Sequence, residues 1–152
     1  MNNKIPHILI VDDDANLLAT MSDILKLKGF DPVIAQTGGA ALAQLEGQSF
    51  DLALIDLCLE DMSGLKVLSA IKARSHETEC ILLTGHASQN SAIEAIQMGV
   101  YGYFQKPFDM EQVLLSIQRA VERSVTEKAL KESERFAHAT VDALSSHLAI
   151  LD

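Results

Sequence analysis

Four groups of polar side chains each follow a short apolar run of the sequence, and their chemical types suit work on a phosphoryl group. Three aspartates, 12–14, follow one run, and a single aspartate, Asp56, follows another. Thr84 ends a third run, and Lys106 and Pro107 follow a fourth. Apolar runs that alternate with helix-period stretches are typical of βα units, where ligands bind at the carboxyl ends of parallel strands. We therefore expect these side chains to meet at one rim of a sheet.

Carboxylates that converge at a rim repel one another unless a cation balances them. Mg²⁺ is the expected cation, because it binds through one or two carboxylates and completes its shell with water and phosphate oxygens. Asp56 is the candidate nucleophile, which would form an aspartyl phosphate. Lys106 would balance the charge of the phosphoryl oxygens, and the Thr84 hydroxyl would donate a hydrogen bond to one of them.

Five apolar runs predict an α/β fold with a five-stranded doubly wound parallel sheet. The expected strands are 8–11, 32–35, 52–55, 81–83 and 101–104. The expected helices are 15–28, 39–46, 65–73, 90–98 and one that begins near Asp109, its N-cap. Glycines at 29, 47 and 99 are expected to close three of these helices.

The composition limits the classes of function. The chain has 152 residues, 48% of them apolar but only 5% aromatic, and a net charge of −9. An aliphatic core and an acidic surface fit a globular domain that does not bind nucleic acid directly. No apolar run reaches the ~18 residues that a membrane span needs. Without a signal peptide, and with two cysteines lacking a CxxC spacing, a reduced, cytoplasmic setting is expected.

From about Pro6 to about Arg123 the chain resembles the receiver domain of two-component response regulators. The motifs that carry this resemblance are Ile8–Asp13, Asp56 after Leu52–Ile55, Met62–Gly64, Leu83–Gly85 and Tyr103–Phe108. The resemblance implies a flavodoxin-like receiver fold. It also implies that Asp56 accepts a phosphoryl group from a histidine kinase or phosphotransfer protein. Such a domain catalyses only its own phosphorylation and dephosphorylation.

The resemblance assigns further roles. Asp12 and Asp13 would bind Mg²⁺ together with Asp56 and the backbone carbonyl of Cys58. Thr84 and Tyr103 would form the switch pair: a phosphoryl group draws Thr84 toward it, and Tyr103 turns into the vacated space. Lys106 would contact the phosphoryl group, and the peptide bond before Pro107 would be cis.

Three residues near the site differ from the family pattern or have a second interpretation. Many receivers have proline where this chain has Glu60, so the shape of that loop is open. The Cys58 thiol is expected to be a small packed group rather than a redox sensor. His86 is expected to be an exposed loop residue, with an effect on water access as the alternative.

Other functions fit the sequence less well. A phosphatase of the haloacid dehalogenase type needs a second aspartate two residues after the nucleophile, where this chain has Cys58. A nucleotide-binding domain would need a glycine-rich phosphate loop, which is missing from the sequence. An interaction module that works without phosphorylation is a further alternative.

We divide the chain into a receiver domain, 1–121, a helical linker, 122–137, and the truncated start of a PAS-like sensor domain, 138–152. The linker is rich in charges of both signs that pair at i,i+4. It is expected either to pack on its own domain or to pair with a second copy as a homodimer, the helix from Asp109 then running through about Leu144. His147 is expected to have no role. In the whole protein, a PAS-like or other output module would follow.

Overall fold

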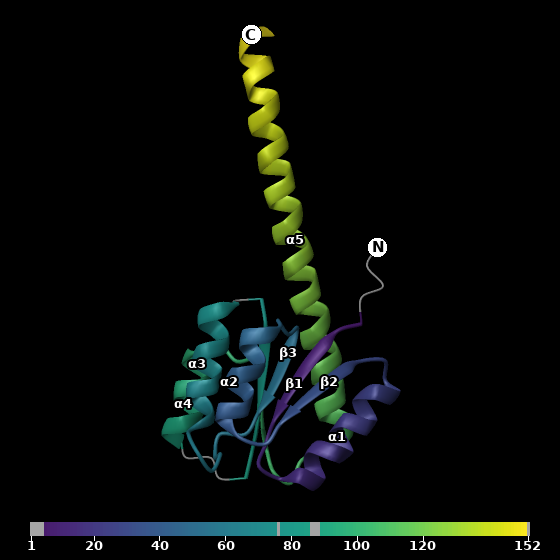
Figure 1. The fold of residues 1–152 in the computed structure, drawn as a ribbon, viewed down its shortest axis with the longest axis vertical. Coiled ribbons are helices and arrows are strands. Elements are labelled where there is room, and N and C mark those ends of the chain that lie inside the picture. Colours follow the sequence, from purple (N-terminus) through teal and green to yellow (C-terminus); the bar gives the residue numbers. More distant parts are fainter. Residues whose placement is uncertain (1–4, 76, 86–88, 152) are drawn as a thin grey trace.

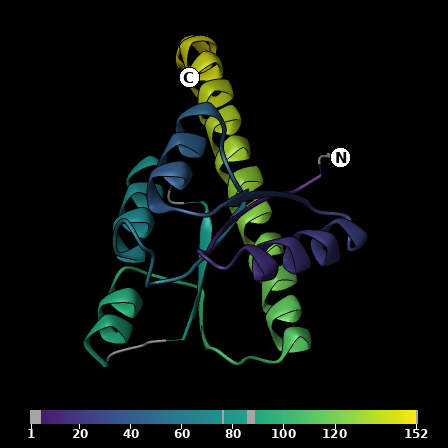
Figure 2. The same ribbon diagram turned by 60° about the horizontal axis from the view of Figure 1, so that its bottom comes forward.

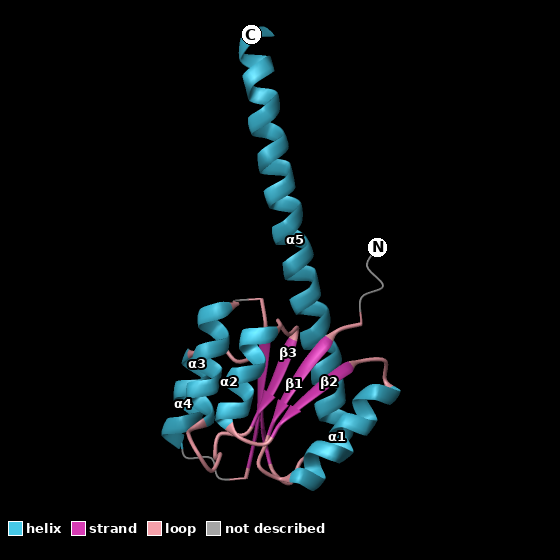
Figure 3. Ribbon diagram, in the orientation of Figure 1, coloured by secondary structure: helices cyan, strands magenta, loops and turns pink. Residues whose placement is uncertain are grey.

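The computed structural model describes residues 5–75, 77–85 and 89–151, with side chains up to residue 133 except that of Gln89. Five parallel strands form one sheet in the order β2-β1-β3-β4-β5 (Figure 1, Figure 3). The strands are β1 (His7–Val11), β2 (Asp31–Ala35), β3 (Leu52–Ile55), β4 (Glu79–Thr84) and β5 (Gly102–Gln105). The predicted doubly wound α/β fold is confirmed.

Five helices cover both faces of the sheet. They are α1 (Ala15–Leu27), α2 (Gly38–Gly47), α3 (Gly64–Arg74), α4 (Gln89–Gln97) and α5 (Met110–Leu151). Helices α1 and α5 lie on one face, and α2, α3 and α4 lie on the other, as Figure 2 shows with the sheet between them. No helix among the described residues is long and apolar enough to cross a membrane.

The strands form the middle of two aliphatic cores because their side chains alternate between the two faces. Leu9, Ala53 and Leu82 belong to the core under α2 and α3, while Ile8, Leu54 and Ile81 belong to the core under α1 and α5. All six side chains are buried. Burial on both faces explains why these strands read as unbroken apolar runs rather than as alternating patterns.

Most helix ends follow the predicted signals. Gly29 and Gly99 have φ angles of +91° and +83°, so they end α1 and α4 in the left-handed conformation that glycine favours. Asp109 accepts a hydrogen bond from the Glu111 N–H at 3.0 Å and caps α5 as expected. Gly47 behaves differently from the prediction. It is the last residue of α2, and the chain leaves the helix through the extended residue Gln48.

The register of the sheet places the sites of interest side by side. Val11 of β1 pairs with Ile55 of β3, so the residues that follow them, Asp12 and Asp56, leave adjacent strands at the same level. The Asp56 N–H donates a hydrogen bond to the Val11 carbonyl at 2.9 Å and extends this pairing by one residue. The pairing of β1 with β3 therefore sets the positions of Asp12 and Asp56 at the carboxyl end of the sheet.

Helix α5 is one continuous helix of 42 residues. The expected continuity from Asp109 through Leu144 is confirmed, and the helix extends to Leu151. The expected truncated start of a PAS-like domain, 138–152, is not supported, because the backbone of 138–151 continues as helix α5 and forms no strand. A strand needs a neighbouring strand for its backbone hydrogen bonds, whereas a helix satisfies them within itself.

Beyond residue 121, where the linker is expected to begin, α5 stays in contact with the rest of the domain for about three further turns. Ser124 is fully buried, and its hydroxyl donates to the Glu77 carbonyl. The Lys128 ammonium lies 2.8 Å from Asp51 Oδ1, and the Lys131 ammonium lies 2.6 Å from Glu77 Oε1. These contacts favour the interpretation that this part of the linker packs on its own domain.

The predicted pairs within the linker form only in part. Arg123 and Glu127 pair at 3.2 Å, as expected for i,i+4 neighbours. Lys128 and Lys131 were expected to pair with glutamates of the helix. Instead they reach across to loops at the amino end of the sheet, because partly buried carboxylates there need a cation more than exposed ones do.

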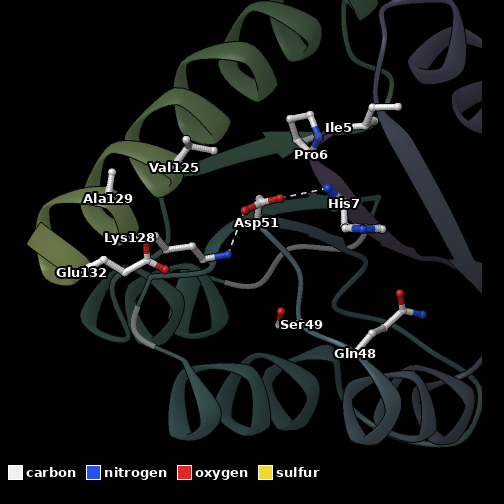
Figure 4. A pocket seen from close by; sticks show the side chains of 10 residues that line it. All are labelled: Ile5, Pro6, His7, Gln48, Ser49, Asp51, Val125, Lys128, Ala129 and Glu132. Atoms are coloured by element: carbon white, nitrogen blue, oxygen red, sulfur yellow. Dashed lines mark hydrogen bonds and ion pairs between the residues drawn. The ribbon is translucent and has the colours of Figure 1, made fainter. Parts of the chain in front are cut away.

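A cavity of about 510 Å³ lies between α5 and the amino end of the sheet. Figure 4 shows Asp51 at its centre, where it accepts hydrogen bonds from the His7 N–H and from Lys128. Val125 and Ile5 give the cavity its exposed apolar walls. The cavity lies at the opposite end of the strands from Asp12 and Asp56.

The attachment of α5 predicts a pH-dependent stability. Hydrogen bonding from Lys131 lowers the pKa of Glu77 from 4.5 to about 2. Since the pKa is lowered on folding, the contact stabilises the fold fully above about pH 4.5 and is lost as the pH falls toward 2. In urea unfolding, Glu77→Gln should cost about 1 kcal/mol at pH 7 and much less at pH 2.5.

The matched control is Glu46→Gln, on the exposed end of α2. An equal loss at both pH values in Glu77→Gln, or the same pH dependence in the control, would contradict the predicted ion pair.

Candidate functional site

Two buried carboxylates and one lysine meet at the carboxyl end of the sheet. Asp12 is 2% exposed and Asp56 is 5% exposed, so both carboxylates are largely removed from water. The ammonium of Lys106, which follows β5, lies 2.7 Å from Asp12 Oδ2 and 3.2 Å from Asp56 Oδ2. The sheet thus brings together three residues that are widely separated in the sequence, as predicted.

Asp13 completes a cluster of three carboxylates. It is exposed, and its carboxylate lies with those of Asp12 and Asp56 so that one oxygen of each falls within 4.8 Å of the others. Such a cluster of hard oxygen donors, open to solvent on one side, fits a hydrated divalent cation such as Mg²⁺. Asp14, the last of the run, instead caps α1 by accepting hydrogen bonds from the N–H groups of Asn16 and Leu17.

Burial and pairing act in opposite directions on the charges at this site. Burial raises the pKa of Asp12 above its usual value, although the hydrogen bond from Lys106 acts against this shift. Burial alone would lower the pKa of Lys106, but its hydrogen bonds and attraction to Asp12 and Asp56 outweigh this and raise it. The lysine therefore remains charged, and it reduces the repulsion between the two acids.

Backbone contacts hold the Asp56 carboxylate and the loop behind it. Asp56 Oδ1 accepts a hydrogen bond from the Cys58 N–H at 3.0 Å, while Oδ2 faces Lys106. Gly64 passes so close behind this turn that a Cβ there would overlap the Asp56 carbonyl oxygen and lie 2.8 Å from Leu57 Cα. Glycine is required at 64 because of this close approach. The Cys58 N–H and the Lys106 ammonium together orient both oxygens of the Asp56 carboxylate.

Thr84 and Tyr103 lie on the same face of the sheet. Thr84 ends β4, two residues after Leu82, and Leu82 pairs with Tyr103 of β5. Leu82 and Tyr103 both pack in the core on the side of α2 and α3, so alternation along β4 directs Thr84 to that side as well. Thr84 is fully buried, and its carbonyl accepts the Lys106 N–H at 2.8 Å.

The Tyr103 hydroxyl is the one unusual polar group of this pair. Its oxygen is buried and has no hydrogen-bond partner among the described residues. Burial, and to a smaller extent the neighbouring Cys58, raises the pKa of the hydroxyl. The tyrosine is therefore neutral at ordinary pH, and its ring packs against the core.

Of the other residues predicted near the site, Pro107 is as expected and Cys58 is not. The Lys106–Pro107 peptide bond is cis, as expected. The Cys58 side chain is exposed rather than packed, because Cys58 forms an antiparallel bridge with Ser63 in a loop at the surface. Cys80 is the buried cysteine, and burial raises its pKa to about 12. His86 and the side chain of His147 lie outside the described residues.

One residue near the site could not be predicted from the sequence. Asp61 lies in the loop after β3, and its two carboxylate oxygens accept the Gly38 and Gly39 N–H groups, each at 2.9 Å. These N–H groups are at the start of α2. Nothing in the sequence near Asp61 indicates a partner more than 20 residues earlier.

The fold and the site together define a class of protein. A five-stranded sheet in the order β2-β1-β3-β4-β5, with an acidic cluster and a lysine at its carboxyl rim, is the architecture expected of a receiver. The family model described as the response regulator receiver domain matches residues 8–118. The chain belongs to this family, and it is a receiver domain of the kind used in two-component signalling.

Solved structures agree with this assignment. A receiver domain protein (CheY-like) from Methanospirillum hungatei JF-1 is 32% identical, with a TM-score of 0.78 over 82% of this chain and 99% of that one. The signal receiver domain of an HD domain-containing protein from Pseudomonas fluorescens Pf-5 is 28% identical, with a TM-score of 0.79 over 85% and 96%.

Curated relatives are longer proteins. The chain is 33% identical to the regulatory protein AtoC of Escherichia coli K12 over 84% of its length, and this covers 28% of AtoC. It is 32% identical to the transcriptional regulatory protein GlrR of the same strain over all of its length, and this covers 33% of GlrR. The chain therefore spans about a third or less of these two regulators.

The site geometry predicts a large cost for removing the lysine. In Lys106→Met, the carboxylates of Asp12 and Asp56 are left buried without a cation, so urea unfolding in EDTA should show a loss of about 2–4 kcal/mol. Adding Asp12→Asn should recover part of this loss, because one of the two opposing charges is then removed.

Lys66→Met, at an exposed position of α3, is the matched control for this experiment. A loss in Lys106→Met no larger than that of the control would show that the lysine does not balance the buried acids.

Proposed function

We propose that Asp56 is the phosphoacceptor of this receiver and that it takes a phosphoryl group from a histidine kinase or phosphotransfer protein. The observation that carries this proposal is the position of Asp56 beside Asp12, Asp13 and Lys106, with its carboxylate oriented at both oxygens. A buried carboxylate with fixed orientation and a neighbouring cation is suited to nucleophilic attack on phosphorus.

The transfer balances as a simple displacement. An Asp56 oxygen forms an O–P bond while the N–P bond of a phosphohistidine breaks, and the electron pair of that bond leaves with the imidazole. The Lys106 ammonium lies where it would balance the charge of the phosphoryl oxygens. Hydrolysis of the acyl phosphate would restore the carboxylate, so the domain would catalyse only its own phosphorylation and dephosphorylation.

Mg²⁺ is the proposed cofactor. Asp12, Asp13 and Asp56 would hold it through carboxylate oxygens, together with the backbone carbonyl of Cys58. When bound, the ion would neutralise negative charge on the phosphoryl oxygens. The donor set supports this proposal because all of these ligands are hard oxygens, which suit Mg²⁺ better than softer metals.

Thr84 and Tyr103 are the proposed switch pair. Thr84 ends β4, and Tyr103 lies on the same face of the adjacent strand β5, opposite Leu82. This position supports a movement in which the Thr84 hydroxyl turns toward the phosphoryl group and Tyr103 fills the space. The Tyr103 hydroxyl has no hydrogen-bond partner among the described residues, so its movement would not break a hydrogen bond there. The surface formed by α4, β5 and α5 would change with it.

The output of the switch is proposed to be a module joined to α5. The alignment with GlrR runs over the whole chain, including the part assigned to a PAS-like domain from the sequence. This supports a module of the kind found in transcriptional regulators more than a PAS-like one. Direct binding of nucleic acid would then belong to that module and not to the receiver, whose net charge is negative.

Phosphorylation of Asp56 has a direct test. After incubation with acetyl phosphate and MgCl₂, intact-mass analysis should show one added phosphoryl group in the wild type and none in Asp56→Asn, because the amide is not a nucleophile of this kind. EDTA should suppress the gain. A wild type that gains no mass, or an unchanged gain in Asp56→Asn, would refute the proposal.

A second test concerns Cys58. Since the proposed ligand is its backbone carbonyl and its side chain is exposed, Cys58→Ala should keep the rate of phosphorylation by acetyl phosphate within about twofold of the wild type at every Mg²⁺ concentration. Asp13→Ala, which removes a proposed carboxylate ligand, is the comparison and should raise the Mg²⁺ requirement. A loss in Cys58→Ala as large as that in Asp13→Ala would show that the thiol takes part.

A further inference from the structure

The loop between β3 and α3, residues 57–63, carries Cys58 but has no proline to stiffen it. Glu60 occupies the position where many receivers have that proline. Three contacts close the loop on itself: the Cys58–Ser63 bridge, the Gly64 N–H to the Leu57 carbonyl at 2.8 Å, and the Cys58 N–H to Asp56. These three contacts join residues 56–58 to one another and to 63–64, and none of them reaches Glu60 or Asp61 at the tip of the loop.

Asp61 fastens this tip to a different element. Its Oδ1 accepts the Gly38 N–H and its Oδ2 accepts the Gly39 N–H, both at 2.9 Å. These are the first two N–H groups of α2, which have no partner within the helix. The two hydrogen bonds lower the pKa of Asp61, so the carboxylate is charged whenever the protein is near neutral pH.

The start of α2 is arranged to receive this carboxylate. The Thr37 hydroxyl accepts the Ala40 N–H at 3.0 Å, and the Thr37 carbonyl accepts the Ala41 N–H at 3.1 Å, so Asp61 takes the two N–H groups that remain. Gly38 also leaves room for the neighbouring side chain of the loop, because a Cβ there would lie 2.5 Å from Met62 Sδ. The loop therefore contacts α2 through two consecutive side chains.

We infer that Asp61 is a positioning residue, which holds the loop against α2 and so keeps the Cys58 carbonyl in place for Mg²⁺. This inference rests on the proposed function. In this chain, a pair of hydrogen bonds to a helix N-terminus does what a rigid turn residue at position 60 would otherwise do. Asp61 is not among the residues proposed to bind the metal or to contact the phosphoryl group, so its effect is expected on Mg²⁺ affinity and not on the transfer step.

The test measures Mg²⁺ binding directly. The full chain is titrated with MgCl₂ by isothermal titration calorimetry, without a phosphodonor. The dissociation constant should be about tenfold higher in Asp61→Ala than in the wild type, because residues that hold a metal ligand in place typically contribute about this much to metal affinity. At saturating Mg²⁺, the rate of phosphorylation by acetyl phosphate should remain within about twofold. Asp61→Asn is isosteric and can make only one of the two hydrogen bonds, so it should also bind Mg²⁺ more weakly.

Thr37→Ala is the matched control, because it removes a hydrogen bond from the same turn of α2 without releasing the loop. Thermal unfolding checks that each variant is folded. Wild-type affinity in Asp61→Ala and Asp61→Asn, or an equal loss in Thr37→Ala, would overturn the inference. A wild type that binds Mg²⁺ but gains no phosphoryl group would instead refute the proposed function, so the two failures are distinguishable.

Discussion

Two carboxylates buried beside each other impose the main constraint on this structure. Asp12 and Asp56 leave adjacent central strands at the same level, and neither has enough contact with water to be solvated as an isolated charge. Lys106 lies within hydrogen-bonding distance of both and offsets only part of their negative charge. The carboxyl rim therefore keeps a net negative charge. Binding of a divalent cation would neutralise this charge, and removal of the lysine would increase it.

Much of the molecule can be understood as support for that arrangement. The aliphatic cores on the two faces fix the register of β1, β3 and β4, and the register fixes where the rim residues lie. Gly64 allows the chain to return closely behind Asp56. Asp61 ties the outer part of the same loop to α2. Close packing and incompletely neutralised carboxylates thus occur together at one edge of the sheet.

The parts predictable from the sequence are those with local signals. Runs such as 8–11 and 52–55 indicate buried parallel strands, and the carboxyl-end rule then brings Asp12, Asp56, Thr84 and Lys106 to one rim. β4 begins at Glu79, two residues earlier than predicted, because a buried glutamate near Arg123 reads as polar in the sequence. Lys128 was expected to pair within its helix, yet its partner Asp51 is 77 positions away. Contacts of this kind depend on the finished fold and leave no local pattern.

The way α5 is attached determines how far its end at Leu151 moves when the helix tilts. Its last described side-chain contact with the rest of the receiver is at Lys131, and the helix then continues to Leu151 without a break. These 20 residues (151 − 131) form a lever arm of about 30 Å at ~1.5 Å per residue. Each degree of tilt about Lys131 moves the far end by about 0.5 Å. A displacement too small to disturb the packing of the sheet is thus enlarged at the end of α5, where its direction depends on which side of the helix is held.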